Sequence, residues 1–511
     1  MIAPGPYKTI FLLVAFAAVL MESCYKEMPL EEPEVWSMPL RVLGFDGVFA
    51  FTDLEEHLLL YTLPYDTISS FSPLVCFGAY QSVEIDGIEL KENEENDLGE
   101  VVLNRPYIVT ARSGNITDSY QLYFTKLPLI QIQTEIMIPD EPKVLSSMEL
   151  AYANVKDGAS ETRVYTSYAG IEIRGRTSAL HEKKAYGLEL WEDSYGKDRK
   201  APLLGLRNGE DWILDAMYID PLRMRNKLSF EIWEKMWESK HETPFRTLNP
   251  GIQCEYIELF INQRYMGLYC LSERLDETLI NLSAAAGAEG VLYKAIDWNG
   301  GATAFQSYSS EPGSSMIWDG WEQVYPDHLY HWEPLAELRK TVVLDEDEMF
   351  IVKIDTLLNL DAAADYYLFT NLLLAHDNII KNYFLTRYAD ESRFLIMPWD
   401  LEASWGIMWH GGESTSNGML ENNLYKRLME LDVEEFNDLL EDRWEHYRES
   451  IFQLDSLLAP ARLYTDLLKQ SGAIERENNR WEGVDIDIDQ ELLYFTQWTA
   501  LRLEYLDQNF D

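Results

Sequence analysis

The feature that most constrains the fold is a change in the spacing of apolar residues along the chain. From about 40 to 160, short segments alternate apolar and polar side chains, as half-buried strands do. Two examples are 83–90 and the pair of strands expected within 107–124. From about residue 171 onward, strands mix with segments of helical spacing, and 421–506 is mostly helical in pattern. The sequence therefore predicts an α+β protein whose helical C-terminal region is preceded by a small β-sandwich.

The charge of the chain argues against several functions. Its 511 residues include 87 Asp and Glu against 42 Lys and Arg, which gives a formal net charge of −45 at pH 7. A nucleic-acid-binding protein needs Lys and Arg to neutralise phosphates, so this balance argues against one. An aromatic content of 13% argues against a disordered acidic chain, which would lack the side chains of a core. Any site for a phosphate-bearing ligand must therefore gather cations locally.

The N-terminus has the pattern of an export signal. Lys8 precedes the apolar run 10–20, which suits a signal peptide and is too short for a stable transmembrane helix. Ser23 and Cys24 follow it and resemble a bacterial lipobox, in which the Cys is acylated. We expect 1–23 to be a lipoprotein signal peptide, 24–39 a linker, and lipid on Cys24 to be the protein's one membrane contact, at the outer membrane or cell surface. An ordinary secretory signal is the alternative.

Cys254 and Cys270 flank a predicted β-hairpin with its turn at 262–263. Counting outward from that turn pairs Glu255 with Cys270. Because side chains alternate between the two faces of a strand, Cys254 would then face away from Cys270. We therefore expect no disulfide between these two cysteines.

The motifs of common nucleotide, zinc-protease and serine-hydrolase sites are absent from the sequence. The densest group of candidate catalytic residues lies instead in two segments, 376–382 and 398–406. Asp377 and Asn382 have the spacing of the protein-kinase catalytic loop, where the Asp orients the attacking hydroxyl and the Asn binds a metal ion. This spacing alone is weak support for a kinase.

An acidic pair follows in the second segment. If that segment is extended, Asp400 and Glu402 project from one face, roughly 6–7 Å apart. Two such charges repel by about 2–3 kcal/mol at an effective dielectric constant near 20. A divalent cation would relieve this repulsion, and oxygen ligands suit Mg²⁺ or Mn²⁺. In a chain with 87 acidic residues the same spacing also arises by chance, with the acids acting as caps or solvated side chains.

Further blocks follow one another in a fixed order between 171 and 505. They are Ile171-Glu-Ile-Arg-Gly-Arg-Thr-Ser, Lys183-Lys-Ala-Tyr-Gly-Leu-Glu-Leu, Leu203-Leu-Gly-Leu with Asp211-Trp-Ile-Leu, Arg225-Asn-Lys-Leu, Ile257-Glu-Leu-Phe-Ile-Asn with Gly267-Leu-Tyr, and Ser272-Glu-Arg-Leu-Asp. Together with the two acidic segments, they resemble the CotH kinases, a family of secreted, atypical kinase-like proteins named after a spore-coat protein. The resemblance implies an atypical protein-kinase-like domain over 165–511, and the predicted sandwich at 40–160 resembles an accessory domain often joined to it.

The resemblance also implies a function. It implies that the protein binds ATP with Mg²⁺ or Mn²⁺ and transfers the γ-phosphoryl group to a Ser or Thr hydroxyl of an extracytoplasmic protein. Asp377 matches the catalytic Asp that accepts or orients the hydroxyl, and Asp400 matches the metal-binding Asp. Asn382 and Glu402 are the expected further metal ligands, with Glu402 in place of the more usual Asp. Five cations of the matching blocks are expected to contact the phosphates: Arg174, Arg176, Lys184, Arg225 and Lys227.

Two other functions stay open on the sequence. A kinase-shaped envelope protein without turnover would act as an adhesin or assembly factor, because ATP is sparse outside the cytoplasm. A glycosidase is suggested by paired carboxylates among many aromatic side chains. Nucleic acid is not an expected partner of any of these.

Overall fold

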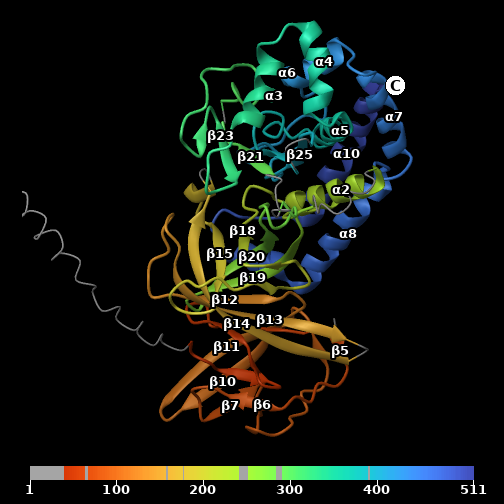
Figure 1. The fold of residues 1–511 in the computed structure, drawn as a ribbon. Coiled ribbons are helices and arrows are strands. Elements are labelled where there is room, and N and C mark those ends of the chain that lie inside the picture. Colours follow the sequence, from red (N-terminus) through yellow and green to blue (C-terminus); the bar gives the residue numbers. More distant parts are fainter. Residues whose placement is uncertain are drawn as a thin grey trace, which may run out of the picture. The chain divides into compact units, whose positions relative to one another are not determined.

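A computed structural model describes residues 39–510 except 64–66, 157–158, 176–177, 241–250, 283–289, 298 and 389–391. The predicted signal peptide, Cys24 and Arg176 lie outside the described residues. The described part combines sheets with helices, so the prediction of an α+β protein is confirmed (Figure 1). Within it, no helix has both the length and the apolar character needed to cross a membrane.

Short strands between residues 43 and 125 form the N-terminal sheets. One sheet has the order β2-β1-β6, another the order β3-β4-β11-β10-β7-β8, and β5 pairs with β9. Their bounds are β1 Leu43–Phe45, β2 Val48–Phe49, β3 Phe51–Asp53, β4 Leu58–Thr62, β5 Thr67–Ile68, β6 Val75–Phe77, β7 Ser82–Ile85, β8 Ile88–Glu89, β9 Val101–Val102, β10 Tyr107–Ser113 and β11 Ile116–Thr125. The rings of Phe45, Tyr61, Phe71 and Phe124 contact one another in their shared core. That these sheets form a sandwich stays a prediction.

The next strands close into a barrel of order β12-β13-β14-β15-β18-β20-β19. Their bounds are β12 Leu129–Gln133, β13 Val144–Lys156, β14 Ala159–Arg174, β15 Ala185–Trp191, β18 Asp211–Asp215, β19 Cys254–Ile261 and β20 Arg264–Glu273. The domain boundary expected between 160 and 165 falls inside β14, which pairs with both β13 and β15. Residues 129–156, assigned from the sequence to the N-terminal domain, therefore belong to the barrel, because alternation identifies a strand but not its sheet.

The hairpin expected around 262–263 is formed by β19 and β20. Asn262 and Gln263 have φ values of 50° and 59°, as a tight two-residue turn of the type I′ class requires. The register then shifts between Leu259 and Phe260, where an extra residue of β20 makes a bulge. The turn was predictable from the sequence, whereas the bulge was not.

This bulge changes the relation between the two cysteines. Cys270 lies opposite Tyr256, not opposite Glu255 as counted from the turn. Cys254 therefore lies on the same face as Cys270, and the prediction of opposite faces is wrong. Both thiols are free and buried, and burial followed by the neighbouring thiol of Cys254 raises the pKa of Cys270.

The remaining strands and the helices follow the barrel along the chain, except for η1, β16, β17 and α2, which lie between barrel strands. They include a sheet of order β22-β23-β21-β24-β25, and β16 pairs with β17. The strand bounds are β16 Ala201–Pro202, β17 Asn208–Gly209, β21 Val291–Ala295, β22 Ile317–Trp318, β23 Trp321–Tyr325, β24 Tyr383–Arg387 and β25 Leu395–Pro398. The helices are η1 Ser178–Leu180, α2 Arg225–Lys240, α3 Glu333–Val343, α4 Asp347–Leu357, α5 Leu360–Leu373, α6 Asn423–Glu430, α7 Phe436–Arg448, α8 Leu454–Ser471, α9 Ala473–Arg480 and α10 Ile488–Phe510.

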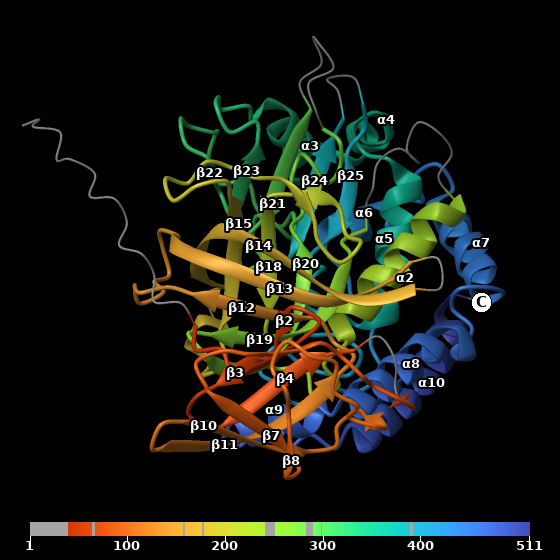
Figure 2. The same cartoon turned by 90° about the horizontal axis from the view of Figure 1, so that it is seen from below.

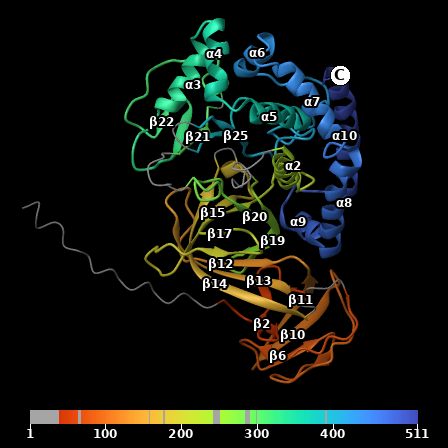
Figure 3. The ribbon, with the colours of Figure 1, turned by 45° about the vertical axis from the view of Figure 1, so that its right-hand side comes forward.

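The helices pack against one another and against strand β25, and local side chains cap the starts of two of them. Helix α5 packs on β25 and α7, α10 packs on α8 (Figure 2), and α3 packs on α4 (Figure 3). Asn359 and Asn422 accept backbone N–H groups at the starts of α5 and α6. Gly472 ends α8 in a left-handed conformation (φ 71°), and a Cβ atom there would lie 1.8 Å from Asn104 Oδ1.

A buried ion pair ties α9 to the barrel. Arg476 donates from Nε and Nη2 to the two carboxylate oxygens of Glu258, at 2.7 and 2.8 Å. Tyr265 and Thr125 donate their hydroxyls to the same carboxylate. The side chains of Glu258 and Arg476 are 0% and 7% exposed, so neither charge has water as an alternative partner.

We expect Arg476→Ala to lower the free energy of unfolding by about 3–5 kcal/mol, because it leaves the buried Glu258 charge without its partner. The control is Arg393→Ala, which removes an exposed pair with Asp355 and should cost less than about 1 kcal/mol. Urea unfolding followed by tryptophan fluorescence measures both. Equal losses in the two variants would contradict the role given to the buried pair.

Candidate functional site

The first segment of the site is a tight turn between α5 and β24, which we call the Asp377 loop (residues 374–382). Helix α5 ends at Leu374 in a left-handed conformation. The Asp377 carbonyl then accepts the N–H groups of Ile380 and Lys381 at 3.1 and 2.7 Å. Lys381 Nζ lies 3.2 Å from Asp377 Oδ2. Asn382 closes the loop with a φ of 56°.

The second segment follows β25 and is called the Asp400 turn (residues 399–402). Strand β24 begins directly after the Asp377 loop, and β25 ends directly before the Asp400 turn. Because the two strands pair antiparallel, the turn lies beside the loop. Asn382 Nδ2 donates to Asp400 Oδ2 at 3.2 Å, and Trp399 N donates to Asn382 O at 3.0 Å. Asp400 has a φ of 54°, a left-handed conformation that costs a non-glycine residue about 1–3 kcal/mol.

Two asparagine side chains hold the Asp400 turn from either side. Asn378 Nδ2 donates to the carbonyls of Asn382 and Trp399, at 2.9 and 2.7 Å. Asn226 Oδ1 accepts the N–H of Leu401 at 3.1 Å. The peptide groups before and after Asp400 are therefore both bound by side chains, which offsets the cost of its backbone conformation.

Asn226 also connects the turn to a third acidic residue. Its Nδ2 donates to Asp215 Oδ2 at 3.0 Å, and Asp215 Oδ1 accepts the N–H of Met217. Asp215 ends barrel strand β18. Desolvation by the surrounding protein, then the charges of Asp215 and Asp377, raise the pKa of Asp400, although its side chain keeps contact with solvent.

Glu402 binds the backbone that follows barrel strand β18. Its Oε1 accepts the N–H groups of Ile219 and Asp220, at 3.0 and 3.3 Å. Burial, then Asp215 and Asp400, raise the pKa of Glu402 well above its usual range. The left-handed Asp400 shows that this segment is not extended, so the arrangement of Asp400 and Glu402 expected for a strand does not apply.

The donor set for a metal ion is small. Among the described residues, no group of three or more His, Cys, Asp and Glu side chains is arranged to hold a metal ion. Asp400 and Asn382 supply two oxygen-bearing side chains in contact with each other. Mg²⁺ is commonly held by one or two carboxylates together with substrate phosphates and water. The pair therefore fits an ion that arrives with phosphate oxygens.

Two cations face this acidic group, Arg174 from the end of β14 and Lys294 from β21, and we call them the cation pair. The Arg174 guanidinium lies 5.4 Å and Lys294 Nζ 5.5 Å from the centre of the Trp399 ring. Burial and then Arg274 lower the pKa of Arg174 to about 10. Burial and then Arg174 lower the pKa of Lys294 to about 8. Across the described chain, neither charged group has a hydrogen-bonding or ion-pair partner.

The other predicted cations lie in different surroundings. Arg225 is buried at the start of α2, where Nη1 pairs with Asp220 and Nε donates to Trp405 O. Lys227 donates to Cys254 O and lies 3.3 Å from Glu231. Lys184 donates to Ala179 O at 2.7 Å. Their contact with phosphates stays a prediction, and these partners favour structural roles for Arg225 and Lys227.

Glu273 and Lys183 also have protein partners. Glu273 lies on β20 and accepts the backbone N–H groups of Arg207 and Gln253, at 2.8 and 3.0 Å. It is thus a strand residue that binds the backbone. Lys183 is fully buried, and its Nζ lies 2.6 Å from Glu477 Oε1 on α9.

Two further site residues carry a signal in the sequence. Lys294 is a charged, half-buried residue in the otherwise apolar strand Val291–Ala295, a position that a lysine seldom takes without a ligand or partner. Asp215 directly follows the apolar run Trp212-Ile-Leu of a recognised block. Asn226 and Asn378 had no signal, because a hydrogen bond between distant backbone segments depends on the tertiary fold.

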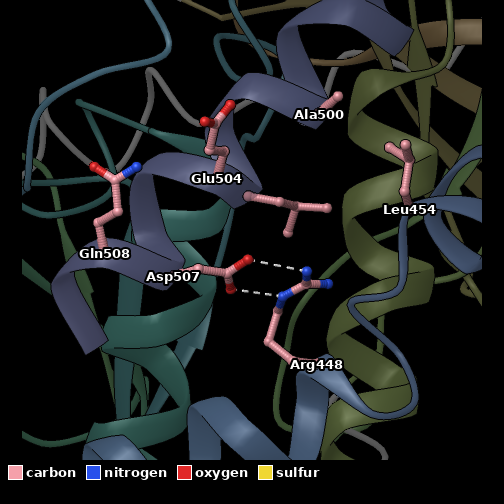
Figure 4. Close-up of a pocket in the computed structure, with 7 residues that line it drawn as sticks. Arg448, Leu454, Ala500, Glu504, Asp507 and Gln508 are labelled. Carbon is pink, nitrogen blue, oxygen red and sulfur yellow. Dashed lines mark hydrogen bonds and ion pairs between the residues drawn. The ribbon is translucent and has the colours of Figure 1, made fainter. Parts of the chain in front are cut away.

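The described chain also has a cavity away from the candidate site. It has a volume of about 350 Å³ and is lined by residues of α7, α8 and α10: Arg448, Leu454, Ala500, Leu503, Glu504, Asp507 and Gln508 (Figure 4). Arg448 and Asp507 form a two-pronged ion pair there, at 2.7 and 3.0 Å. None of the predicted site residues lines it.

The fold and the site together define an α+β protein in which two acidic loops meet a pair of cations. Over 171–506, about two thirds of the chain, the sequence matches the family model described as CotH kinase protein. The chain therefore belongs to the CotH family, and the resemblance seen in the sequence is confirmed. It is also 23% identical over 343 residues to the inner spore coat protein H of Bacillus subtilis (strain 168), covering 66% of this chain and 82% of that protein. Membership of this family indicates a kinase-like protein.

We expect the ammonium group of Lys294 to titrate near pH 8, against about 10.4 for an ordinary lysine. Competitive acetylation across pH 6–11 with mass spectrometry measures this pKa. Arg174→Gln removes a neighbouring positive charge and should raise the pKa of Lys294. A pKa of Lys294 that is ordinary, or unaltered by Arg174→Gln, would contradict the described cation pair.

Proposed function

We propose that this protein is a metal-dependent atypical kinase that transfers the γ-phosphoryl group of ATP to a Ser or Thr hydroxyl of an extracytoplasmic protein. The observation that carries the proposal is the meeting of Asp377, Asn382 and Asp400 with the cation pair. Family membership supports a kinase-like activity in general. The signal-peptide pattern supports a location at the cell envelope, with lipid on Cys24 as the anchor.

The cation pair supports a triphosphate as the ligand. The chain carries a net charge of −45, so most of its surface is expected to repel the anionic ATP. Arg174 and Lys294 both lie near the ring of Trp399, and burial, then the charge of Arg174, lowers the pKa of Lys294. An anion between them would relieve this repulsion without breaking an existing ion pair. Phosphoryl transfer relies mainly on positioning and on neutralising charge, which such cations supply.

Asp400 and Asn382 are the residues that would hold the metal ion. The ion supplies charge neutralisation of the phosphates when it is bound. Desolvation, then the negative charges of Asp215 and Asp377, raise the pKa of Asp400, and a divalent cation beside Asp400 would offset the repulsion between these acids. Glu402 accepts the N–H groups of Ile219 and Asp220 with Oε1, and its role as a further metal ligand stays a prediction.

Asp377 is the residue that would orient the acceptor hydroxyl. Its side chain is 22% exposed, so a substrate hydroxyl has access to its carboxylate. Lys381 lies 3.2 Å from the same carboxylate and holds it in place. The carboxylate would accept the hydrogen bond of the hydroxyl and take its proton as the oxygen attacks.

We expect Asp377→Ala and Asp400→Ala each to lower phosphate incorporation from labelled ATP by at least about 100-fold. The assay uses Mn²⁺ and a casein-like acceptor, and thermal unfolding verifies that the variants fold. Asp455→Ala, at a side chain that is 92% exposed, is the control and should retain full activity. If either site variant incorporated phosphate at the rate of the Asp455→Ala control, the role proposed for that residue would be wrong.

We expect Lys294→Met to weaken the binding of ATP with Mn²⁺ by about 10-fold, the loss of roughly 1.4 kcal/mol of a charge-assisted contact. The ammonium form exists below the pKa of about 8 and is lost above it. ATP affinity should therefore fall as the pH rises through 8, and Lys294→Arg should remove this dependence. Calorimetry at pH 7 and pH 9 measures both effects, with Lys426→Met, at an exposed side chain, as the control.

The same titrations separate the kinase from a kinase-shaped binding protein. A protein that binds ATP with Mn²⁺ and gives no labelled product would be catalytically silent. A protein without any ATP-dependent heat or shift in melting temperature would be an adhesin or assembly factor, and the nucleotide site proposed here would be wrong.

A further inference from the structure

A small internal cavity lies beneath the Asp377 loop, between α5, β24 and α6. Its volume is about 10 Å³, close to the minimum of about 10–15 Å³ for one water molecule. The lining includes apolar and polar side chains: Phe305, Ile396, Leu424, Tyr366, Tyr383, Tyr425, Asn378 and Asn422. A polar cavity of this size is a binding site for water if polar atoms within it are free to bond.

Two such atoms line the cavity. Asn378 Oδ1 and the Tyr425 hydroxyl are fully buried and have no hydrogen-bond partner among the described residues. Each of these two residues is 1% exposed. A buried polar atom left without a partner costs about 1–3 kcal/mol. Two unpartnered atoms on one small cavity therefore point to a ligand that bonds to both.

The orientation of the Asn378 amide is fixed by its other partners. Its Nδ2 donates to the carbonyls of Asn382 and Trp399, which are acceptors only. Flipping the amide would place Oδ1 against two carbonyl oxygens. Oδ1 must therefore point away from the Asp400 turn, where it needs a donor.

The neighbouring polar groups each have at least one partner. Tyr366 donates its hydroxyl to Asn378 O at 2.7 Å, and Tyr383 donates to Thr303 O at 2.5 Å. Asn422 donates one amide hydrogen to Ile379 O and caps α6 with its Oδ1. Among the described residues, the Tyr425 hydroxyl and Asn378 Oδ1 are thus the polar atoms of this lining without any hydrogen-bond partner.

We infer that this cavity binds one water molecule, which accepts the Tyr425 hydroxyl hydrogen and donates to Asn378 Oδ1. The water completes the hydrogen bonds of the side chain that holds both Asn382 O and Trp399 O. Tyr425 on α6 is thereby a positioning residue for the Asp400 turn, although it touches neither acid of the site. The presence of the water stands by itself, whereas the positioning role rests on the proposed function.

A crystal structure of the full mature chain tests the water directly. The expected result is a single peak within hydrogen-bonding distance, about 2.6–3.2 Å, of both Asn378 Oδ1 and the Tyr425 hydroxyl oxygen. A cavity without such a peak, or a direct bond between the two side chains, would overturn the inference. This outcome does not depend on whether the protein is a kinase.

The positioning role is tested by the Mn²⁺ concentration that gives half-maximal phosphate incorporation. We expect Tyr425→Phe to raise it by about 10-fold, as loss of an outer partner of a metal ligand does, with the KM for ATP unchanged. Tyr383→Phe is the matched control, because it removes a buried hydroxyl from the same cavity but breaks only the bond to Thr303. Its Mn²⁺ requirement should equal that of the unmodified protein.

Equal shifts in Tyr425→Phe and Tyr383→Phe, or no shift in either, would refute the positioning role. Asn378→Ala should reproduce the Tyr425→Phe shift, and a normal Mn²⁺ requirement in Asn378→Ala would refute it equally. If the unmodified protein neither binds Mn²⁺ nor incorporates phosphate, the proposed function fails and the positioning role with it. The presence or absence of the water peak in the crystal structure would then still test the proposed water-binding site.

Discussion

The site depends on holding one aspartate in an unfavourable backbone conformation among like charges. Asp400 has a left-handed backbone, and desolvation, then the charges of Asp215 and Asp377, raise its pKa. Pairing of β24 with β25 sets it beside Asn382, and Asn378 and Asn226 bind the peptide groups on either side of it. These contacts come from α2, the Asp377 loop and the strand pair, so the site requires the tertiary fold to be complete.

The second requirement is a positive charge inside an acidic chain. Buried cations in the described chain mostly meet carboxylates, as Arg476 meets Glu258 and Arg225 meets Asp220. Arg174 and Lys294 instead lie over Trp399, an arrangement that keeps both charges near the acids without neutralising either. The π-electrons of an aromatic ring attract cations without forming an ion pair with them. A carboxylate in the same place would pair with the cations and leave them unavailable to a ligand.

The sequence predicted the parts of this account that depend on local spacing. Asp377 and Asn382 lie five residues apart on one loop, and the turn at Asn262-Gln263 is a local property. Features that depend on the tertiary fold were not predictable. The bulge that sets Cys254 and Cys270 on one face is one, and the membership of β13 in the barrel is another. Lys227 and Glu231 are four residues apart on α2, so their ion pair follows from helical spacing, whereas the burial of Arg225 against Asp220 depends on the tertiary fold.

The central claim is that the Asp400 turn and the cation pair bind the same nucleotide. It is tested most directly by the anomalous diffraction of Mn²⁺ in crystals grown with Mn²⁺ and a non-hydrolysable ATP analogue. The account predicts a manganese peak in contact with the carboxylate of Asp400, and phosphate density between that ion and the side chains of Arg174 and Lys294. Manganese or phosphates bound elsewhere on the chain, with Asp400 and the cation pair free of both, would contradict it.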